Sequence, residues 1–222
     1  MAVGGKLSRM QTGKKTGRPP TLSTVDIVEA ALAGDLSELT MPSVAKRLGV
    51  SHSALYRYFA DREALLRACS DHVVRQTVWP DSNRPWREFL KDFCDVLWSS
   101  FERYPGLAQV GLAVPGTPPA IIEIVEKLVG SLTAQGFTPH DAILAVDFIS
   151  EVTMTQFAMM AAMDKTVSSA DSRSARQAYQ ESWNASESLI EGIGDESTWH
   201  GRGWLDEKIT IMLDGLEKRV IG

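Results

Sequence analysis

The stretch from residue 41 to residue 59, MPSVAKRLGVSHSALYRYF, has the spacing of two short helices that cross at a tight corner. Ala45 is small enough to lie where two helices touch, and Gly49 tolerates the positive φ that ends the first helix. Apolar side chains recur at the spacing needed to fill such a corner: Val44, Leu48, Val50, Leu55 and Phe59. The stretch therefore predicts a helix-turn-helix at residues 41–60.

The outer face of the second helix is polar or small, and consists of His52, Ser53, Ala54, Arg57 and Tyr58. A helix of this length fits the major groove of duplex DNA, where such groups form hydrogen bonds with base edges. The alternative is a helical hairpin that only packs. The polar outer face, the basic segment before it and the capped helix after it favour DNA binding.

The rest of the chain also has helical periodicity, without hairpin signals or a strand–helix alternation, so the predicted fold class is all-α. Ser23, Thr40, Ser51 and Asp61 are suited to cap helix N-termini. The apolar face of the first helix is predicted to be Val25, Val28, Ala31 and Leu32. The expected helices span about 24–34, 40–49, 51–59, 62–79, 85–104, 119–135, 139–165 and 205–220, with a helical patch at 175–185.

Charge is distributed unevenly along the chain. Residues 1–79 contain eleven Lys and Arg against seven Asp and Glu, whereas the remaining 143 residues contain twelve against twenty-one. A basic end on an acidic body directs one face of a protein toward a polyanion. The first twenty residues are the most basic stretch, and they are either a solvated tail or a flexible arm that contacts DNA.

Two cysteines, Cys69 and Cys94, are too few and too far apart for a disulfide framework or a zinc knuckle, so buried free thiols are expected. No apolar stretch follows the basic start as it would in a signal peptide. The longest uncharged run, residues 104–122, contains four prolines and is unsuited to a membrane helix. These features predict a soluble, cytoplasmic protein with no membrane attachment.

The run Gly49-Val50-Ser51-x-x-x-Leu55-Tyr56-x-x-Phe59-x-x-Arg62-Glu63-x-Leu65 resembles the signature of the tetracycline-repressor family. The Gly17-Arg18-Pro19 segment is similar to arms that precede the first helix in that family. The close resemblance covers about residues 15–75. Beyond Pro80 it is mainly one of architecture, although the body resembles the tetracycline-repressor branch itself.

This resemblance implies that the second helix of the motif reads DNA. Ser53, Ala54 and Arg57 would face base edges, and Arg57 would read guanine because its guanidinium matches O6 and N7. Tyr56 would hold a phosphate, Arg62 would add a cationic phosphate contact, and Tyr58 would contact backbone or base. The full set of expected DNA contacts is Lys15, Arg18, Thr40, His52, Ser53, Ala54, Tyr56, Arg57, Tyr58 and Arg62.

Three parts are expected along the chain: a flexible basic arm at 1–20, a DNA-binding head at 21–79, and a body for regulation and dimerisation at 80–222. The helix that begins at Arg62 joins the head to the body. Helices 139–165 and 205–220 are long enough to pair with their copies as a four-helix interface. A periodic stripe in the first of them serves either this interface or the core: Ala142, Ala145, Val146, Ile149, Val152, Thr153, Gln156 and Met160.

The body is also expected to bind a small-molecule effector among its aromatic and sulfur-containing side chains. The candidate ligand residues are Trp98, Phe101, His140, Asp147, Gln156, Phe157, Met160 and Trp183, although residues of these types belong to a core more often than to a ligand site. A metal-bound tetracycline suits this branch of the family. The four histidines, however, show no ligand spacing, so neither a metal site nor a cofactor is predicted.

The predicted function is a homodimeric regulator, a repressor that an effector releases from a palindromic stretch of double-stranded DNA. A helix-turn-helix protein that works without an effector is the first alternative. A helical enzyme is the second, although the chain lacks a phosphate-binding glycine loop, an HExxH pair and a GxSxG elbow.

Overall fold

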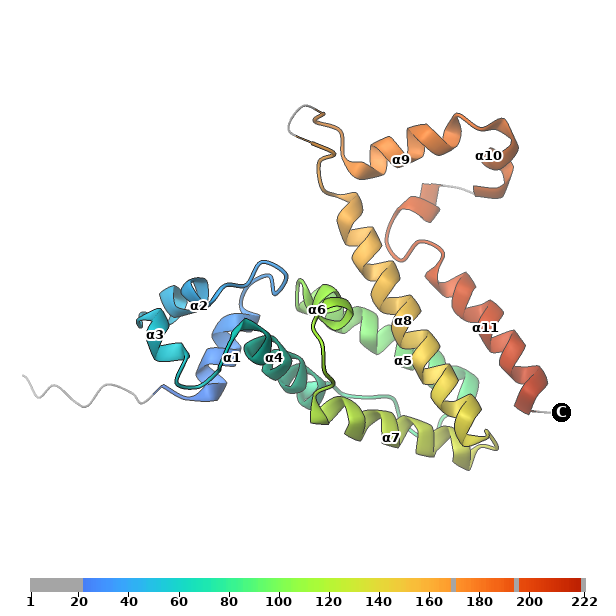
Figure 1. The fold of residues 1–222 in the computed structure, drawn as a ribbon. Helices are drawn as coiled ribbons and strands as arrows, with labels where there is room; N and C mark the ends of the chain where they lie inside the picture. Colours follow the sequence, from blue (N-terminus) through green and yellow to red (C-terminus); the bar gives the residue numbers. More distant parts are fainter. Residues whose placement is uncertain (1–21, 169–170, 194–195, 221–222) are drawn as a thin grey trace, which may run out of the picture.

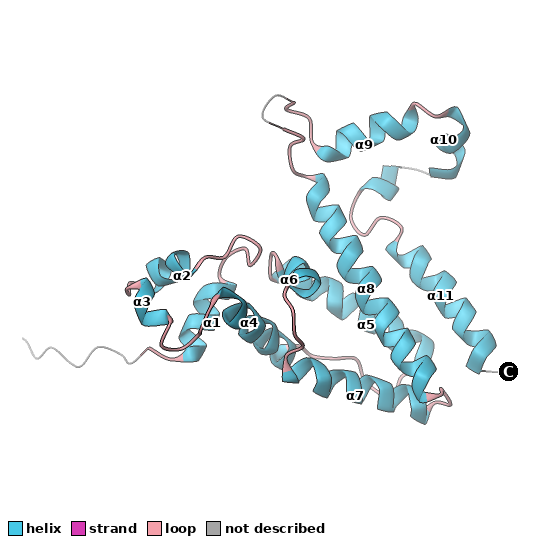
Figure 2. Ribbon diagram, viewed as in Figure 1, coloured by secondary structure: helices cyan, strands magenta, loops and turns pink. Residues whose placement is uncertain are grey.

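The computed structural model describes residues 22–168, 171–193 and 196–220, and across these ranges the chain is all-helical, as predicted (Figure 2). No strand occurs in them, and a single bridge joins Thr166 to Ser174. The predicted arm, with Lys15 and Arg18, lies outside the described residues. The helices are α1 Thr24–Leu32, α2 Met41–Leu48, α3 His52–Leu55, α4 Arg62–Gln76, α5 Trp86–Arg103, α6 Leu107–Ala113, α7 Pro119–Ala134, α8 Pro139–Met163, α9 Ala175–Asn184, α10 Glu187–Ile193, the 3₁₀ turn η1 Glu196–Trp199, and α11 Leu205–Val220.

Helices α1 to α4 form the head, at the left of Figure 1, and side-chain caps set where three of them begin. The Ser23 amide donates to Asp26 at 2.8 Å while the Asp26 amide donates to the Ser23 hydroxyl at 3.1 Å. Thr40 and Ser43 exchange the same pair of bonds at the start of α2, and Asp61 accepts from the amide of Ala64. These three predicted caps are confirmed. Each satisfies amides that the first helical turn leaves unpaired.

Three details of the head differ from prediction. Val25 is 51% exposed and Ile27 is fully buried, because Ile27, Val28 and Ala31 share one side of α1 and Val25 does not. Helix α3 ends at Leu55, and residues 56–58 continue as a turn; the Ser51 side chain does not cap it. Helix α4 ends at Gln76 instead of near residue 79.

In the body, α8 is the central helix and contacts α5, α6, α7, α9 and α11 (Figure 1). Helices α9 and α10 stand beyond the ends of α8 and α11. Helices α6 and α10 were not predicted, since a seven-residue helix is too short to show a periodic pattern. Helix α6 follows Gly106, whose φ of 82° is readily adopted only by glycine.

The periodic stripe on α8 belongs to the core of the single chain, so its interpretation as a dimer interface was wrong. All its members are buried except the half-buried Val152. The opposite side of α8 instead exposes four large apolar side chains: Ile143, Leu144, Phe148 and Met159. Among the described helices, only α8 is long and apolar enough to cross a membrane by length and composition, yet it packs against five others.

The apolar core does not stop at the expected boundary between head and body. The cluster that fills the head continues into Phe101 at the end of α5 and into Leu107 and Val110 of α6. A second cluster joins α5, α7, α8 and α11. Movement of α6 therefore transmits directly to the packing of the head.

Both cysteines are buried free thiols, as predicted. Burial raises the pKa of Cys69 to about 12. Burial also raises the pKa of Cys94, whose sulfur lies 3.3 Å from the Thr153 hydroxyl. Both thiols consequently remain protonated near neutral pH.

Candidate nucleic-acid interface and effector cavity

The corner between α2 and α3 is held by the residues that the sequence singled out. Gly49 ends α2 with a φ of 67°, and the Val50 amide donates to the carbonyl of Ala45 at 3.1 Å. Ala45 is buried where α2 meets α3, and Leu55 anchors the single turn of α3 in the head core. The short recognition segment is thus fixed from beneath by one fully buried leucine.

The residues predicted to read bases lie on α3 and in the turn that follows it, and most of them are exposed. His52, Ser53 and Arg57 are exposed, Tyr56 is 50% exposed, and Ala54 is half-buried. The rings of His52 and Tyr56 meet edge to face at 6.4 Å. Thr40, also exposed, caps α2 beside this surface. These exposed side chains offer imidazole, hydroxyl and phenol groups, and Arg57 adds a guanidinium.

Arg62 and Tyr58 lie differently from expectation, because both side chains turn into the head. The guanidinium of Arg62 donates to the carbonyls of Leu39 at 2.7 Å, Ser37 at 3.0 Å and Leu36 at 3.4 Å. The Tyr58 hydroxyl donates to the carbonyl of Leu22 at 2.7 Å. Since the Arg62 donors already pair with the α1–α2 loop, this geometry favours a structural clamp over the expected phosphate contact.

Helix α4 ties the head to the body through several polar contacts. Asp71 accepts from the Ala120 amide at 2.9 Å, at the start of α7. Arg75 forms two 3.0 Å hydrogen bonds with the carboxylate of Glu123 on α7. A separate link joins the α1–α2 loop to the body, where the Leu36 amide donates to the carbonyl of Pro105 at 2.8 Å.

Between α4, α5, α6, α7 and α8 the body encloses a cavity of about 260 Å³. Helix α4 supplies one wall of it with Arg67, Ser70, Val73, Val74 and Thr77. The other walls are mostly apolar: Trp79, Phe93, Leu97, Phe101, Leu107, Val110, Gly111, Val114, Pro118, Ile121, Ile124, Val125, Leu128 and Met154, with Ser100, Gly116, Thr117 and Ser150. The helix that carries the head therefore also touches whatever occupies this cavity.

Two family models cover most of the chain. Residues 23–69 match the bacterial regulatory proteins of the tetR family, and residues 79–191 match the tetracyclin repressor-like C-terminal domain. The chain belongs to the tetR family of regulatory proteins. The resemblance seen at residues 49–65 is thereby confirmed.

Three relatives illustrate what the chain is similar to. The transcriptional repressor DrrR1 of Streptomyces coeruleorubidus is 30% identical over 62% of this chain and 54% of its own length. The chain thus spans about half the length of this tetR-family relative. The crystal structure of BioQ with its double-stranded DNA operator is 30% identical over 62% of this chain and 89% of that chain, with a TM-score of 0.55. ActR of Streptomyces coelicolor with actinorhodin shares the fold, with a TM-score of 0.74 and 20% identity over 91% and 98% of the chains.

Of the expected ligand residues in this tetR-family body, only Phe101 lines the enclosed cavity. Trp98 and Phe157 pack edge to face at 4.9 Å, and Met160 lies in the second core cluster. Gln156 accepts from the Lys208 ammonium, His140 and Asp147 are exposed, and Trp183 packs against Trp199. The structure thus brings Trp98, Phe101 and Phe157 together in one aromatic cluster, whereas His140, Asp147 and Trp183 are not part of it. The lining comes from α4 to α8 and the loop after α4, and it offers small, hydroxyl and aliphatic side chains with three aromatic ones, in no distinctive sequence pattern.

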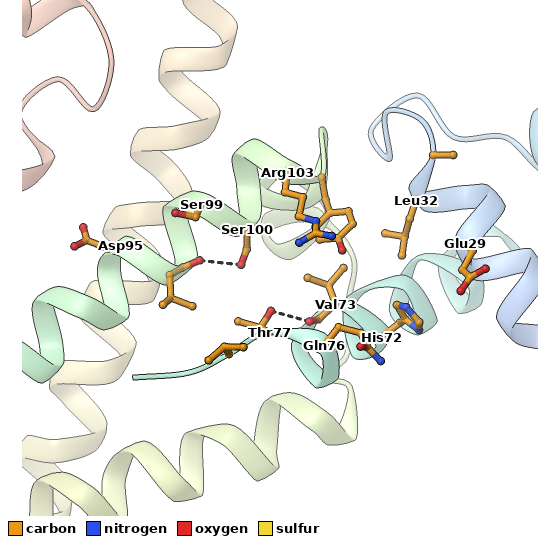
Figure 3. Close-up of a pocket in the computed structure, with 14 residues that line it drawn as sticks. Glu29, Leu32, His72, Val73, Gln76, Thr77, Asp95, Ser99, Ser100 and Arg103 are labelled. Atoms are coloured by element: carbon orange, nitrogen blue, oxygen red, sulfur yellow. Dashed lines mark hydrogen bonds between the residues drawn. The ribbon is translucent and has the colours of Figure 1, made fainter. Parts of the chain in front are cut away.

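A second hollow lies on the other side of α4, between α1, α4 and α5 (Figure 3). It is an open groove of about 860 Å³ with polar edges that include Glu29, His72, Asp95 and Arg103. It shares Val73, Thr77 and Ser100 with the enclosed cavity, so α4 and α5 separate the two spaces.

Proposed function

We propose that this chain is a sequence-specific, DNA-binding transcription repressor whose affinity for DNA is controlled by a small molecule bound in the body. The observation that carries the proposal is the double role of α4. Its first turn is clamped to the head by Arg62, and its following turns line the cavity with Arg67, Ser70 and Val73. A ligand that shifts α4 therefore shifts the recognition surface.

The proposal draws on what its relatives are named for. DrrR1 is a repressor, BioQ was solved with its operator, and ActR was solved with a small molecule. None of these relatives is an enzyme. The enclosed cavity of this chain also argues against a helix-turn-helix protein that works without an effector, because a filled core would be more stable.

We propose that the working unit is a homodimer, as is usual for this family. Ile143, Leu144, Phe148 and Met159 on α8 lie exposed beside α11, where Ile211 is 73% exposed. Helices 139–163 and 205–220 of two copies would bury these side chains in a four-helix interface. The two recognition surfaces would then meet half-sites about 34–36 Å apart, or further apart if the DNA bends.

Sequencing the genomic fragments that the purified chain retains tests this proposal. We expect one near-palindromic sequence shared by the retained fragments, and a dimer by analytical ultracentrifugation. Retention without a common sequence, or a monomer at micromolar concentration with and without DNA, would contradict it.

Control by an effector is tested by reciprocity. If the ligand favours the released state, operator DNA must weaken ligand binding by the same factor, which corresponds to about 1–3 kcal/mol in typical cases. Calorimetric titration of an effector measures its affinity for the free chain and for the operator-bound chain. Equal affinities would exclude this mode of control.

A further inference from the structure

The polar groups of the enclosed cavity are almost all hydrogen-bond acceptors. Five hydroxyl groups line it, and four of them donate their proton to the carbonyl four residues earlier in the chain; the fifth is that of Thr117. The four bonds run from Ser70 to Leu66 at 3.2 Å, Thr77 to Val73 at 2.7 Å, Ser100 to Val96 at 2.8 Å and Ser150 to Val146 at 2.7 Å. A hydroxyl that has used its proton still offers lone pairs. A ligand in this cavity meets acceptors that require donors of its own.

The aromatic side chains of the lining also leave no hydrogen-bond donor free for a ligand. The indole nitrogen of Trp79 donates to the carbonyl of Val74 at 3.1 Å, so this donor too is already used. Phe93 and Phe101 complete the ring-lined side of the cavity. Flat, ring-containing molecules stack well against such walls.

One charged side chain stands in this lining, and it is Arg67 of α4. Its Nη1 donates to the carbonyl of Pro115 at 3.3 Å, a long hydrogen bond. A guanidinium has five N–H donors in a planar fork, which suits it to pair with a carboxylate, sulfonate or phenolate. Within the described lining, Arg67 is therefore the group that attracts an anion.

A metal-bound tetracycline does not fit this cavity. A divalent cation such as Mg²⁺ needs carboxylate ligands or a comparable set of oxygen donors, and imidazole serves softer metals. The described lining contains no Asp, Glu or His, and its one charge is the positive Arg67, which repels a cation. Across the described residues, no three His, Cys, Asp or Glu side chains gather closely enough to hold a metal ion.

The part of the lining where α6 meets α8 can change shape. A Cβ added at Gly111 of α6 would lie 2.4 Å from the sulfur of Met154 on α8, so the glycine lets this flexible side chain approach. Methionine adapts readily to different apolar shapes. This part of the lining accordingly accepts ring systems of varied shape. Arg67 and the hydroxyl acceptors determine which polar groups a ligand must carry.

From this inventory we infer that the effector is a metal-free, ring-containing weak acid, with O–H or N–H donors and one anionic group that pairs with Arg67. This inference rests on the proposed function, because it names the ligand class of the same cavity. The pairing would draw Arg67 away from the Pro115 carbonyl. Since Arg67 lies on α4, the anionic group would act on the helix that carries the head.

The fluorescent probe 1-anilinonaphthalene-8-sulfonate tests the inference with the full chain, because it combines fused rings, an N–H donor and a sulfonate. We expect saturable binding with one site per chain, unaffected by EDTA. Arg67→Gln should weaken binding about tenfold or more, the usual consequence of losing a charge-assisted hydrogen bond. Arg75→Gln is the matched control on the same helix, where the arginine does not line the cavity, and should leave the affinity within about twofold.

Two filling variants distinguish the cavity from apolar patches on the surface. Val110→Phe fills it from α6 and Ser150→Leu fills it from α8, so either one should abolish saturable binding provided that its denaturation curve remains cooperative. The cationic dye thioflavin T should bind at least about tenfold more weakly than the sulfonate, because it meets Arg67 without a counter-charge.

Three outcomes overturn the inference: equal sulfonate affinity in Arg67→Gln, tighter binding of thioflavin T, or binding of tetracycline that requires Mg²⁺ and is lost in EDTA. Failure of the proposed function is seen separately, as the absence of a common sequence among retained DNA fragments. A chain that binds its operator but prefers a cation or a metal chelate would refute only the ligand class.

Discussion

In the head, helices α1 to α4 close around Ile27, Leu36, Leu55 and Leu65, each fully buried, whereas helices α4 to α8 leave a cavity of about 260 Å³ between them. The outer surfaces differ as well. The head presents a polar face on α3, and the body presents Phe148 and Met159 on α8.

This difference indicates what each region must do. Unfilled space costs packing energy, so a cavity persists in a protein when something other than stability maintains it. The head must hold a fixed surface for DNA, and it is filled accordingly. The body must respond to a ligand, and its adjustable parts are the cavity and the helices around it.

The largest expected effect comes from comparing two buried leucines. Leu65→Ala opens a hole in the filled head and should cost about 4–5 kcal/mol of unfolding free energy. Leu128→Ala, equally buried on α7, only enlarges the existing cavity. Leu128 has fewer neighbours to lose, so its cost should be nearer 2–3 kcal/mol. Urea denaturation of both variants measures the difference, and equal losses would mean that the cavity is as tightly packed as the head.

The next largest effect is expected at Gly106, where the body contacts the α1–α2 loop of the head. A Cβ there would lie 2.3 Å from the Ser37 amide nitrogen and from the Asp35 carboxylate, and the φ of 82° is also unfavourable for alanine. Gly106→Ala should therefore cost about 2–4 kcal/mol, the sum of backbone strain and overpacking.

Gly136→Ala is the matched control for Gly106→Ala. Its φ is 101°, but no atom lies within 4 Å of the added Cβ, so only the backbone strain of about 1–2 kcal/mol remains. The difference between the two variants isolates the contact between α6 and the α1–α2 loop. If both variants lower the free energy of unfolding by the same amount, head and body are not in close steric contact at Gly106.

Two arginines of the head should separate recognition from stability. Arg57→Ala removes an exposed donor and should cost about 1–3 kcal/mol of operator binding, with relaxed preference at one base pair. Arg62→Ala removes three bonds to loop carbonyls and should instead cost about 1–2 kcal/mol of head stability. Binding titrations over operator variants and a salt series distinguish them. If the slope of log K against log salt concentration fell by about one unit in Arg62→Ala, the result would support the phosphate contact that was first expected of Arg62.

The contrast between head and body also decides what the sequence could reveal. The helix-turn-helix follows from local chemistry, since Gly49, Thr40 and Asp61 act on neighbours a few residues away. The longer helices of the body were predicted as well, but not the neighbours that each face would meet. Periodicity on α8 indicates one buried side and cannot say whether the cover is α5 or a second chain.

The cavity was harder still to predict. Its lining combines positions from five helices, and the hydroxyls that face it look in sequence like ordinary surface serines and threonines. Large aromatic residues such as Trp98 and Trp183 attracted attention because rings often bind ligands. They lie instead in ring-to-ring contacts elsewhere. The inward turn of Arg62 depends equally on the path of the α1–α2 loop, which no local pattern specifies.

The smallest expected effect concerns the exposed ion pair between Arg75 of α4 and Glu123 of α7. Its two 3.0 Å hydrogen bonds hold the pKa of Glu123 below its ordinary value of 4.5. A lowered carboxyl pKa contributes stability above the unfolded value, and this contribution is lost as the pH falls through the folded one. The pair therefore acts fully at neutral pH and weakens only below about pH 4.5.

Breaking this pair should change stability little, because solvent screens an exposed ion pair. It should nevertheless loosen the attachment of α4 to the body, and a ligand would then move the head less effectively. We expect Arg75→Gln and Glu123→Gln each to reduce the factor by which an effector weakens operator binding by about two- to fivefold. The double variant should be no worse than either single one, since both remove the same link. Additive losses in the double variant would show that the two residues act separately. An unchanged factor would leave the hydrogen bonds of Asp71 with Ala120, of Arg67 with Pro115 and of Leu36 with Pro105 to couple the filled head to the adjustable body.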